Sequence, residues 1–327
     1  MEEELAMADN QYLYEVARIR TKELSLLSAE FFEQLLSAPD YDACIRLLKE
    51  KGWESGRDDW EEMLAKERQK TWELMEELVG DTSVFDVFFY ANDYSNLKAA
   101  VKSCRHRTEL SNIYIDQGTV PVSTIRTAVL ENRFEDLPEA MREPAREAQT
   151  VLLQTSDGQL CDVIIDRAAL EAVYRAGKES GNEFLRLYGE LTVACADIKI
   201  AVRASRTGKS REFLERALAP CDSLDIRRLT EAALEGGEAV EHYLYTTEYH
   251  EGAAEMKQSL SAFERWCDNL MIQRIRPQLY NAFGIGPLAA YILARESEIK
   301  SVRIVLSGKK NHLPDQSIRE RVRETYV

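Results

Sequence analysis

The chain has 327 residues, of which 45% are hydrophobic, and a formal net charge of −15 at pH 7. This length is enough for a full hydrophobic core divided over two or three domains. The acidic balance argues against a surface built to neutralise nucleic-acid phosphates. The 15 glycines are too few for a turn-rich all-β or Rossmann-type protein. We therefore expect a soluble helical protein without a nucleic-acid partner.

Helical periodicity runs through almost the whole chain. Leu13, Val16, Leu24 and Leu27 lie close to one helical stripe and predict a first helix over residues 11–36. Further helices are predicted, in chain order, over residues 58–80, 84–105, 137–155, 162–176, 182–206, 251–276, 287–307 and 315–327. Residues 113–115 form a short extended candidate. The pattern as a whole predicts an all-α fold.

Local signals mark several of the expected helix ends. Asp58 and Glu61 have the spacing of a capping box, and Gly80 is placed to end the helix that they begin. Pro287 and Pro314 suit the first turn of a helix, where a missing N–H costs nothing.

A short segment recurs three times along the chain. Each copy has a polar residue, an aliphatic residue and a lysine, followed by a valine and a cation. The three copies begin with Asn96-Leu97-Lys98, Asp197-Ile198-Lys199 and Glu298-Ile299-Lys300, and their lysines are spaced 101 residues apart. The third copy lacks one residue before its valine. A Gly-Lys pair also follows Arg203 and Arg303 by the same step.

Repeats of this length predict three similar helical domains around a pseudo-threefold axis. The expected domains are residues 1–115, 116–220 and 221–327, and the N-terminal helix is a candidate to pack on the third. Equivalent cationic patches would then lie on related helices. The candidate interface residues are Lys98, Lys102, Lys199, Arg203, Lys300 and Arg303. The alternative is that these cations belong to ordinary solvated helix faces.

Motifs for catalysis and cofactor binding are incomplete. Residues 207–210 (TGKS) resemble the end of a phosphate-binding loop, but Arg203 occupies the position where that loop needs glycine. The four histidines have no metalloprotease spacing, and no G-x-S-x-G motif marks a nucleophile. We expect a non-enzymatic protein without a cofactor, a metal ion or direct nucleotide binding.

The cysteines, the N-terminus and the apolar segments bear on location. The six cysteines contain no C-x-x-C pair and are expected to be buried reduced thiols, which suits the cytoplasm. The acidic first residues do not resemble a secretory signal. Residues 284–294 are too few to cross a bilayer, which needs about 20 residues.

The aromatic-rich residues 85–90 predict core packing, with a partner-facing patch as the alternative.

The C-terminal third carries a family resemblance. Its segments are residues 291–300 (YILARESEIK), 302–304 (VRI), 306–314 (LSGKKNHLP) and 318–327 (IRERVRETYV). Together they resemble the closing signature of the C subunits of V/A-type ATPases and ATP synthases, the counterparts of the eukaryotic d subunit. Residues 93–98 resemble the family's first-domain motif, and residues 17–20 its opening helix. Residues 197–199 resemble the second-domain motif, although Ala196 stands where a polar residue is expected.

The resemblance implies a funnel of three similar helical domains without an active site. It implies a place in the central stalk, at the cytoplasmic face of the membrane. The implied partners are the D and F subunits of the rotor shaft and the membrane ring of c/K-type subunits. The implied role is to couple ATP turnover or synthesis to proton or sodium transport. The alternative is a generic helical scaffold of another complex.

Overall fold

The chain folds into helices alone in the part that the computed structural model describes, residues 12–54, 60–106 and 113–327. The predicted all-α class is confirmed for these residues. The chain divides into two compact units. We call Ser83–Ala254 the middle unit, and Met1–Thr82 with Glu255–Val327 the terminal unit. Three similar domains arranged as a funnel remain a prediction.

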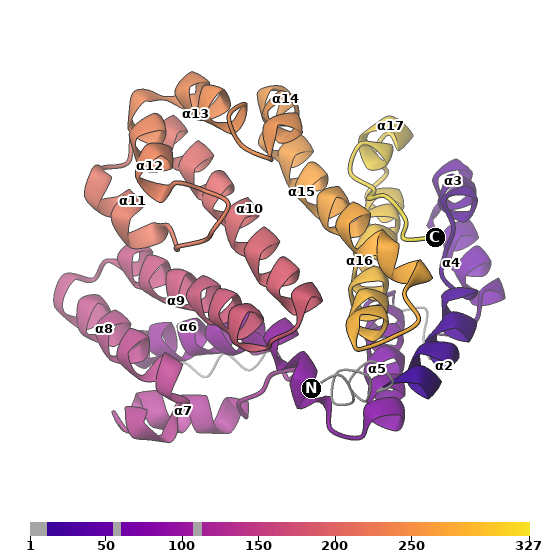
Figure 1. The fold of residues 1–327 in the computed structure, drawn as a ribbon, viewed down its shortest axis with the longest axis horizontal. Coiled ribbons are helices and arrows are strands. Elements are labelled where there is room, and N and C mark those ends of the chain that lie inside the picture. The colour runs from indigo at the N-terminus through magenta and orange to yellow at the C-terminus, as the bar shows by residue number, and fades with distance from the viewer. Residues whose placement is uncertain (1–11, 55–59, 107–112) are drawn as a thin grey trace, which may run out of the picture. The chain divides into compact units, whose positions relative to one another are not determined.

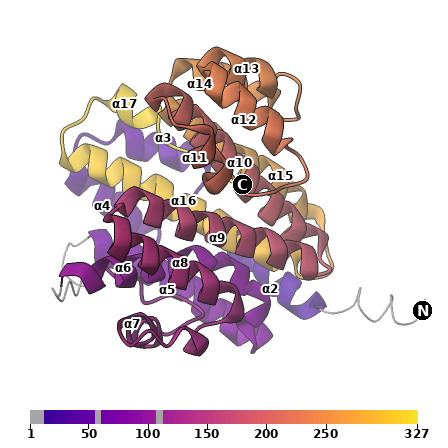
Figure 2. The ribbon, with the colours of Figure 1, turned by 90° about the vertical axis from the view of Figure 1, so that its left-hand side faces the viewer.

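The middle unit is a stack of helices in which α9 lies between α8 and α10 (Figure 1). Its elements are η1 (Thr82–Phe88), α6 (Tyr90–His106), α7 (Val122–Leu130), η2 (Phe134–Asp136), α8 (Glu139–Thr155), α9 (Gly158–Glu179), α10 (Glu183–Thr207), α11 (Arg211–Ala217), α12 (Ile226–Glu235) and α13 (Gly237–Leu244). Helices α11, α12 and α13 pack against α10 (Figure 2). The helix α14 (His250–Gln258) runs across the boundary between the two units.

Two glycines let α9 and α10 approach closely. A Cβ atom at Gly177 would lie 2.6 Å from the carbonyl oxygen of Leu185. A Cβ atom at Gly189 would lie 3.1 Å from the carbonyl oxygen of Val173. Because both neighbours are backbone atoms, they can give way only if the helices move apart. The absence of side chains at these two positions therefore sets the spacing of the pair.

The terminal unit is built around α16. Its elements are α2 (Leu13–Glu23), α3 (Ala29–Ser37), α4 (Tyr41–Glu50), α5 (Trp60–Val79), α15 (Leu260–Ile275), η3 (Arg276–Tyr280), α16 (Gly286–Lys310) and α17 (Asp315–Arg319). Helices α2, α4, α5, α15 and α17 all pack against α16. Of its 25 residues, 17 are buried, so this helix forms the core of the unit rather than a surface layer.

The prediction of a single helix over residues 11–36 is wrong. Residue 11 lies outside the described residues, and α2 and α3 are separated by residues 24–28. Ser28 begins α3, because its side chain accepts a hydrogen bond from the Phe31 N–H. The Leu27 N–H donates to Glu298 Oε2 at 2.6 Å. A distant carboxylate therefore satisfies a main-chain donor at the break.

Three other expected helices are interrupted, begin as a 3-10 helix or end early. Residues 251–276 are interrupted at Ser259, whose side chain accepts a hydrogen bond from the Ala262 N–H and caps α15. Residues 84–105 begin as the 3-10 helix η1 before α6 starts at Tyr90. The helix expected over residues 315–327 ends at Arg319, and the following segment is held by side chains of α15. Residues 113–115 form no strand.

Local signals mark several of the described helix ends, among them the end that the sequence predicts at Gly80. Asn182 caps α10, and Gly208 ends it in the left-handed conformation with a φ of 62°. Gly80, with a φ of 69°, follows α5. Asp58, half of the expected capping box, lies outside the described residues. Among the helices that are described, none combines the length and the apolar character needed to span a membrane.

Candidate functional site

The three recurring segments lie on three long helices. The first is on α6, the second on α10 and the third on α16, which have 17, 25 and 25 residues. The polar residue that begins each copy is buried, with exposed fractions of 0% for Asn96, 0% for Asp197 and 7% for Glu298. Each of these side chains accepts a hydrogen bond from the main chain of a segment outside its own helix. The recurrence was visible in the sequence, but this role was not.

Asn96 on α6 pairs with the main chain of Ile115. Its Nδ2 donates to the Ile115 carbonyl oxygen at 2.8 Å, and its Oδ1 accepts the Ile115 N–H at 2.8 Å. One turn earlier, the carboxylate of Asp93 accepts the N–H groups of Thr119 and Val120, both at 3.2 Å, and the Thr119 hydroxyl at 2.6 Å. Burial raises the pKa of Asp93 above its ordinary value, while these hydrogen bonds act in the opposite direction. The two side chains together hold residues 115–120 against α6.

Asp197 on α10 has the same place in the second copy. Its Oδ1 accepts the Ala219 N–H at 3.1 Å. Its Oδ2 is buried and has no hydrogen-bond partner among the described residues. Burial raises the pKa of Asp197 to about 8, because a charged carboxylate loses its hydration there. At neutral pH the side chain is therefore mostly a neutral acid, close in charge and shape to an asparagine.

Glu298 on α16 belongs to a buried ionic network in the terminal unit. Arg295 lies between Glu298, with which it forms an ion pair, and Glu67 of α5, whose Oε2 is 2.6 Å from its Nη2. The guanidinium carbon of Arg295 also lies 5.3 Å from the centre of the Trp53 ring. Burial raises the pKa of Glu298, against the influence of Arg295 and of the Leu27 N–H. The network joins α16 to α5 and to the start of α3.

The cations of the first copy form ion pairs within the middle unit. Lys98 Nζ lies 2.5 Å from Asp166 Oδ1, and Lys102 Nζ lies 2.6 Å from Asp162 Oδ1. Lys98 and Lys102 are one turn apart on α6, and Asp166 and Asp162 are one turn apart on α9. These two predicted interface residues therefore connect α6 to α9.

The cations of the third copy are also paired, within the terminal unit. Lys300 forms an ion pair with Asp268 of α15. Arg303 Nη2 lies 3.2 Å from Glu61 Oε2, and its guanidinium carbon lies 5.8 Å from the centre of the Trp60 ring. The two cations connect α16 to α15 and to α5.

The second copy differs in its lysine. Lys199 is half-buried on α10 and forms no ion pair or hydrogen bond in the part of the chain that the structure describes. Arg203, one turn further on, is exposed. The three lysines are therefore not equivalent, because aspartates neutralise Lys98 and Lys300, whereas no described residue neutralises Lys199. Whether the six predicted residues bind a partner stays a prediction.

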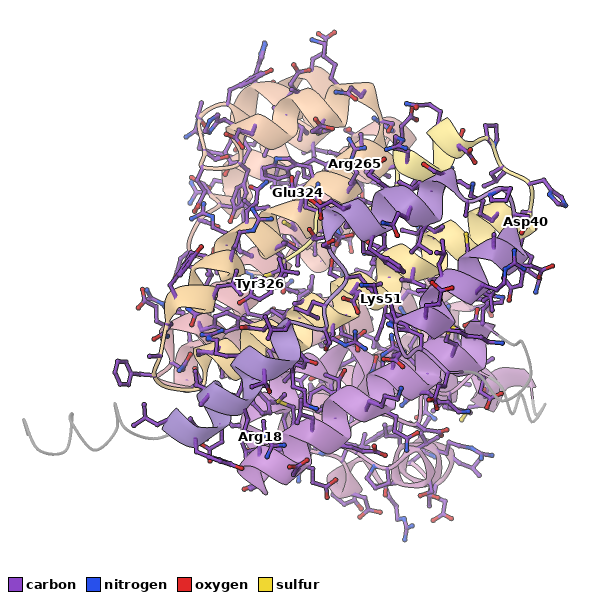
Figure 3. The ribbon with its side chains drawn as sticks, turned by 90° about the vertical axis from the view of Figure 1, so that its right-hand side faces the viewer. Arg18, Asp40, Lys51, Arg265, Glu324 and Tyr326 are labelled. Atoms are coloured by element: carbon purple, nitrogen blue, oxygen red, sulfur yellow. The ribbon has the colours of Figure 1, made fainter. Side chains whose placement is uncertain are left out.

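The chain near the C-terminus lies along one face of α15. Arg265 and Glu324 lie close together on this face, with Tyr326 further along the segment (Figure 3). The contacts are Arg265 Nη1 to the Glu320 oxygen at 2.6 Å, the Glu324 N–H to Asn269 Oδ1 at 2.9 Å, and Arg276 Nη2 to the Thr325 oxygen at 2.7 Å. Tyr326 is 4% exposed. Main-chain groups that a further helix would have paired internally are thus satisfied by side chains of α15 and η3.

The residues that resembled a phosphate-binding loop form a turn between two helices. Gly208 ends α10, and the Ser210 side chain accepts the Phe213 N–H to begin α11. No group of histidine, cysteine and carboxylate side chains in the described residues is arranged to hold a metal ion. The six cysteines carry no disulfide, and four of them are buried: Cys44, Cys161, Cys195 and Cys267.

Comparison with known proteins identifies the family. A family model described as ATP synthase (C/AC39) subunit matches residues 16–321. The chain belongs to this family, the C subunits of V/A-type ATPases. It is 24% identical over 319 residues to the C subunit of the V-type sodium ATPase of Enterococcus hirae, covering 94% of this chain and 97% of that protein. The resemblance carried by residues 291–327 is confirmed.

Two further C subunits match over similar lengths. That of the V-type ATP synthase of Thermus thermophilus is 24% identical over 328 residues, which cover 97% of this chain and 99% of that protein. That of the A-type ATP synthase of Methanocaldococcus jannaschii is 21% identical over 339 residues, which cover 94% and 85%. The family match over residues 16–321 therefore includes all three recurring segments.

Proposed function

We propose that this C subunit is a non-catalytic rotor component of the central stalk. It would couple the shaft of D and F subunits to the membrane ring of c/K-type subunits, on the cytoplasmic side, for proton or sodium transport. The observation that carries the proposal is the family match over residues 16–321. One relative is named for a sodium ATPase and two are named for ATP synthases, so these names include both directions of the reaction and, in one case, the ion.

A coupling subunit must pass torque without deforming, and the packing within each unit supports this role. Close-packed helices transmit strain because their interiors have low compressibility. In the middle unit, α9 and α10 meet at glycines, and α6 is joined to α9 by two ion pairs. In the terminal unit, a buried network joins α16 to α5. We also propose that the three recurring segments mark three similar domains, closing into a funnel.

Lys199 is the best-supported candidate for contact with an acidic group on the shaft. It is the one lysine of the three recurring segments that has no acidic partner in the described part of the chain. A charge that is not neutralised within its own chain is available to a partner. Arg203 lies one turn away on the same helix and would extend the same patch.

Charge reversal tests this contact. The double variant Lys199→Glu/Arg203→Glu should weaken binding of the isolated D–F shaft by about tenfold or more, and leave binding to the membrane ring unchanged. Arg186→Glu, at an exposed cation on the same helix α10, is the matched control and should bind both partners normally. Equal loss of both partners in the double variant would contradict the contact.

Co-purification separates the rotor proposal from a generic scaffold. The full chain, mixed with the D–F shaft and with the detergent-solubilised ring, should bind each of them and bridge the two. A scaffold of another complex would bind neither. This result does not depend on which residues make the contact.

A further inference from the structure

A cavity of about 810 Å³ opens within the middle unit. Its walls come from η1, the first turns of α6 and α8, and the last turns of α9. Apolar and aromatic groups make its floor, among them the buried side chains of Val87, Tyr94, Met141 and Leu185. The aromatic-rich residues 85–90 are thus divided, with Phe85 packed in the core and Tyr90 lining the cavity.

The charges that line this cavity are mostly negative. Four carboxyl groups, those of Asp86, Asp93, Glu139 and Glu179, line it together with a single cation among the described residues, Arg175. Asp86, Asp93 and Glu179 also raise the pKa of the Tyr90 hydroxyl, which lines the cavity too, although burial is the larger cause. A cleft with walls of low dielectric and one predominant sign of charge concentrates its field on an incoming group of the opposite sign.

Two of these carboxylates have no partner within the described part of the chain. Glu139 and Glu179 form no ion pair or hydrogen bond there. The cavity of about 590 Å³ in the terminal unit is different, because each of the arginines that line it binds a group of its own unit. The cavity of the middle unit therefore retains charge that the described residues do not neutralise.

The walls of the cavity are fixed before anything binds. The Tyr94 hydroxyl donates to the Ala140 carbonyl oxygen at 3.1 Å, which holds the start of α8 against α6. The Asp93 carboxylate is held by the segment after Gly118, where a Cβ atom would lie 2.3 Å from Asp93 Oδ1. A preformed site loses little conformational freedom on binding, which favours affinity.

We propose that this cavity docks a basic amphipathic segment of another subunit of the same complex. Its lysine or arginine side chains would meet Glu139 and Glu179, and its apolar side chains would cover the floor. Charge complementarity selects a cationic occupant, and the apolar floor selects one that also carries hydrophobic groups. The proposal rests on the family membership of the chain and does not require the coupling role or the Lys199 contact.

Zero-length carbodiimide coupling, which joins a carboxylate to a lysine amine, tests the proposal in the assembled complex. We expect cross-linked peptides that join Glu139 or Glu179 to a lysine flanked by apolar residues in another subunit. Glu135 and Glu231, exposed carboxylates of the same unit, serve as internal controls and should not share that partner. Cross-links from Glu139 and Glu179 to no other subunit, or to the same segments as the controls, would overturn the proposal.

Charge reversal gives a second, independent measurement. Glu139→Lys/Glu179→Lys should lower incorporation of the chain into the complex by about tenfold or more at low salt, whereas Glu135→Lys/Glu231→Lys should not. The neutral variant Glu139→Gln/Glu179→Gln should lose part of the binding and keep the wild-type circular dichroism, which separates lost docking from failed folding. Wild-type incorporation of both cavity variants would refute the proposal, and shaft binding dependent on Lys199 could still hold.

Discussion

Asp197 begins the second recurring segment as Asn96 begins the first, and each accepts a main-chain N–H through its Oδ1 atom. The Nδ2 of Asn96 donates to the Ile115 carbonyl oxygen, whereas the second oxygen of Asp197 has no partner among the described residues. An ionised carboxylate is costly at such a place, and a protonated one is tolerated. The pair shows one structural position occupied by an amide in one copy and by a neutral acid in another.

The stability of the chain should therefore depend on pH through Asp197. Burial raises the pKa of Asp197 from 3.8 to about 8. Between these values the folded chain keeps a proton that the unfolded chain has released, so stability falls as the pH rises through this window and levels off above it. Asp197→Asn should remove this slope and stabilise the chain by on the order of 1–3 kcal/mol at alkaline pH. Urea unfolding at about pH 5, 7 and 9 measures the effect.

The mirror variant is the control for this prediction. Asn96→Asp introduces an acid at the equivalent position of α6 and should lose stability most at alkaline pH. If Asp197→Asn and the wild type unfold at the same denaturant concentration at every pH, Asp197 is not a buried acid held neutral in the folded chain.

The Arg295 network should be sensitive to the loss of its cation. Arg295→Met leaves Glu67 and Glu298 buried without their shared partner and should destabilise the chain by roughly 3–5 kcal/mol at neutral pH. Part of the loss should be recovered as the pH falls, because protonation removes the uncompensated charges. Thermal unfolding followed by circular dichroism measures this.

A variant without any of the three charges separates charge from packing. Arg295→Met/Glu67→Gln/Glu298→Gln should be more stable than Arg295→Met alone. No buried charge is left without a partner in it, because Lys70, the other partner of Glu67, is half-exposed, and the glutamine that replaces Glu298 can still accept the Leu27 N–H. A triple variant as unstable as the single one would show that the methylene and ring contacts of Arg295, not its charge, are decisive.

The spacing of α9 and α10 should depend on Gly177. Gly177→Ala places a methyl group 2.6 Å from a backbone oxygen, so the helices must separate at a cost of about 1–3 kcal/mol. Gly158→Ala is the matched control at the start of the same helix, where nothing lies within 4 Å of the added atom. It should be neutral or slightly stabilising. Equal effects of the two substitutions would argue against close packing as the reason for Gly177.

The C-terminal segment should be released when its contacts with α15 and η3 are removed. Arg265→Ala/Arg276→Ala deletes the two charged donors to the carbonyl oxygens of Glu320 and Thr325, each worth roughly 1.5–3 kcal/mol. The expected result is faster amide exchange in residues 320–327 and faster trimming by a carboxypeptidase, with unchanged exchange in α9 and α10. Unaltered exchange in the segment would mean that its remaining contacts, namely Arg323 with Asp268, the Glu324 N–H with Asn269 and the burial of Tyr326, are enough to retain it.

The helix ends show which features of the fold can be predicted from the sequence and which cannot. Asn182 and Gly208 lie at the two ends of α10, and each acts through contacts within three or four residues. The predicted helix therefore agrees with the observed one to within one residue at each end. The break between α2 and α3 was missed. Its Leu27 N–H is satisfied by Glu298, which is 271 residues away in sequence, and no local pattern shows that a donor there has a partner. Ser259, by contrast, is a local cap that sequence inspection could have found.

The candidate site divides in the same way. The equal spacing of Lys98, Lys199 and Lys300 revealed the recurring segments, and the signature near residue 300 pointed to the family, since both are properties of residue order. Only the tertiary structure decided which lysines are neutralised. Asp166 and Asp268 reach two of them from neighbouring helices, and Lys199 has no such neighbour in the described residues.

The all-α class and the family follow from residue order, because helix periodicity, caps and motifs act over a few residues. The partners of buried polar groups, the spacing of helices and the charge left open in a cavity come from side chains that meet only when distant helices pack. The role of a charged side chain depends on its neighbours in space. A carboxylate beside a lysine is neutralised, whereas one in an open cavity is available to a partner.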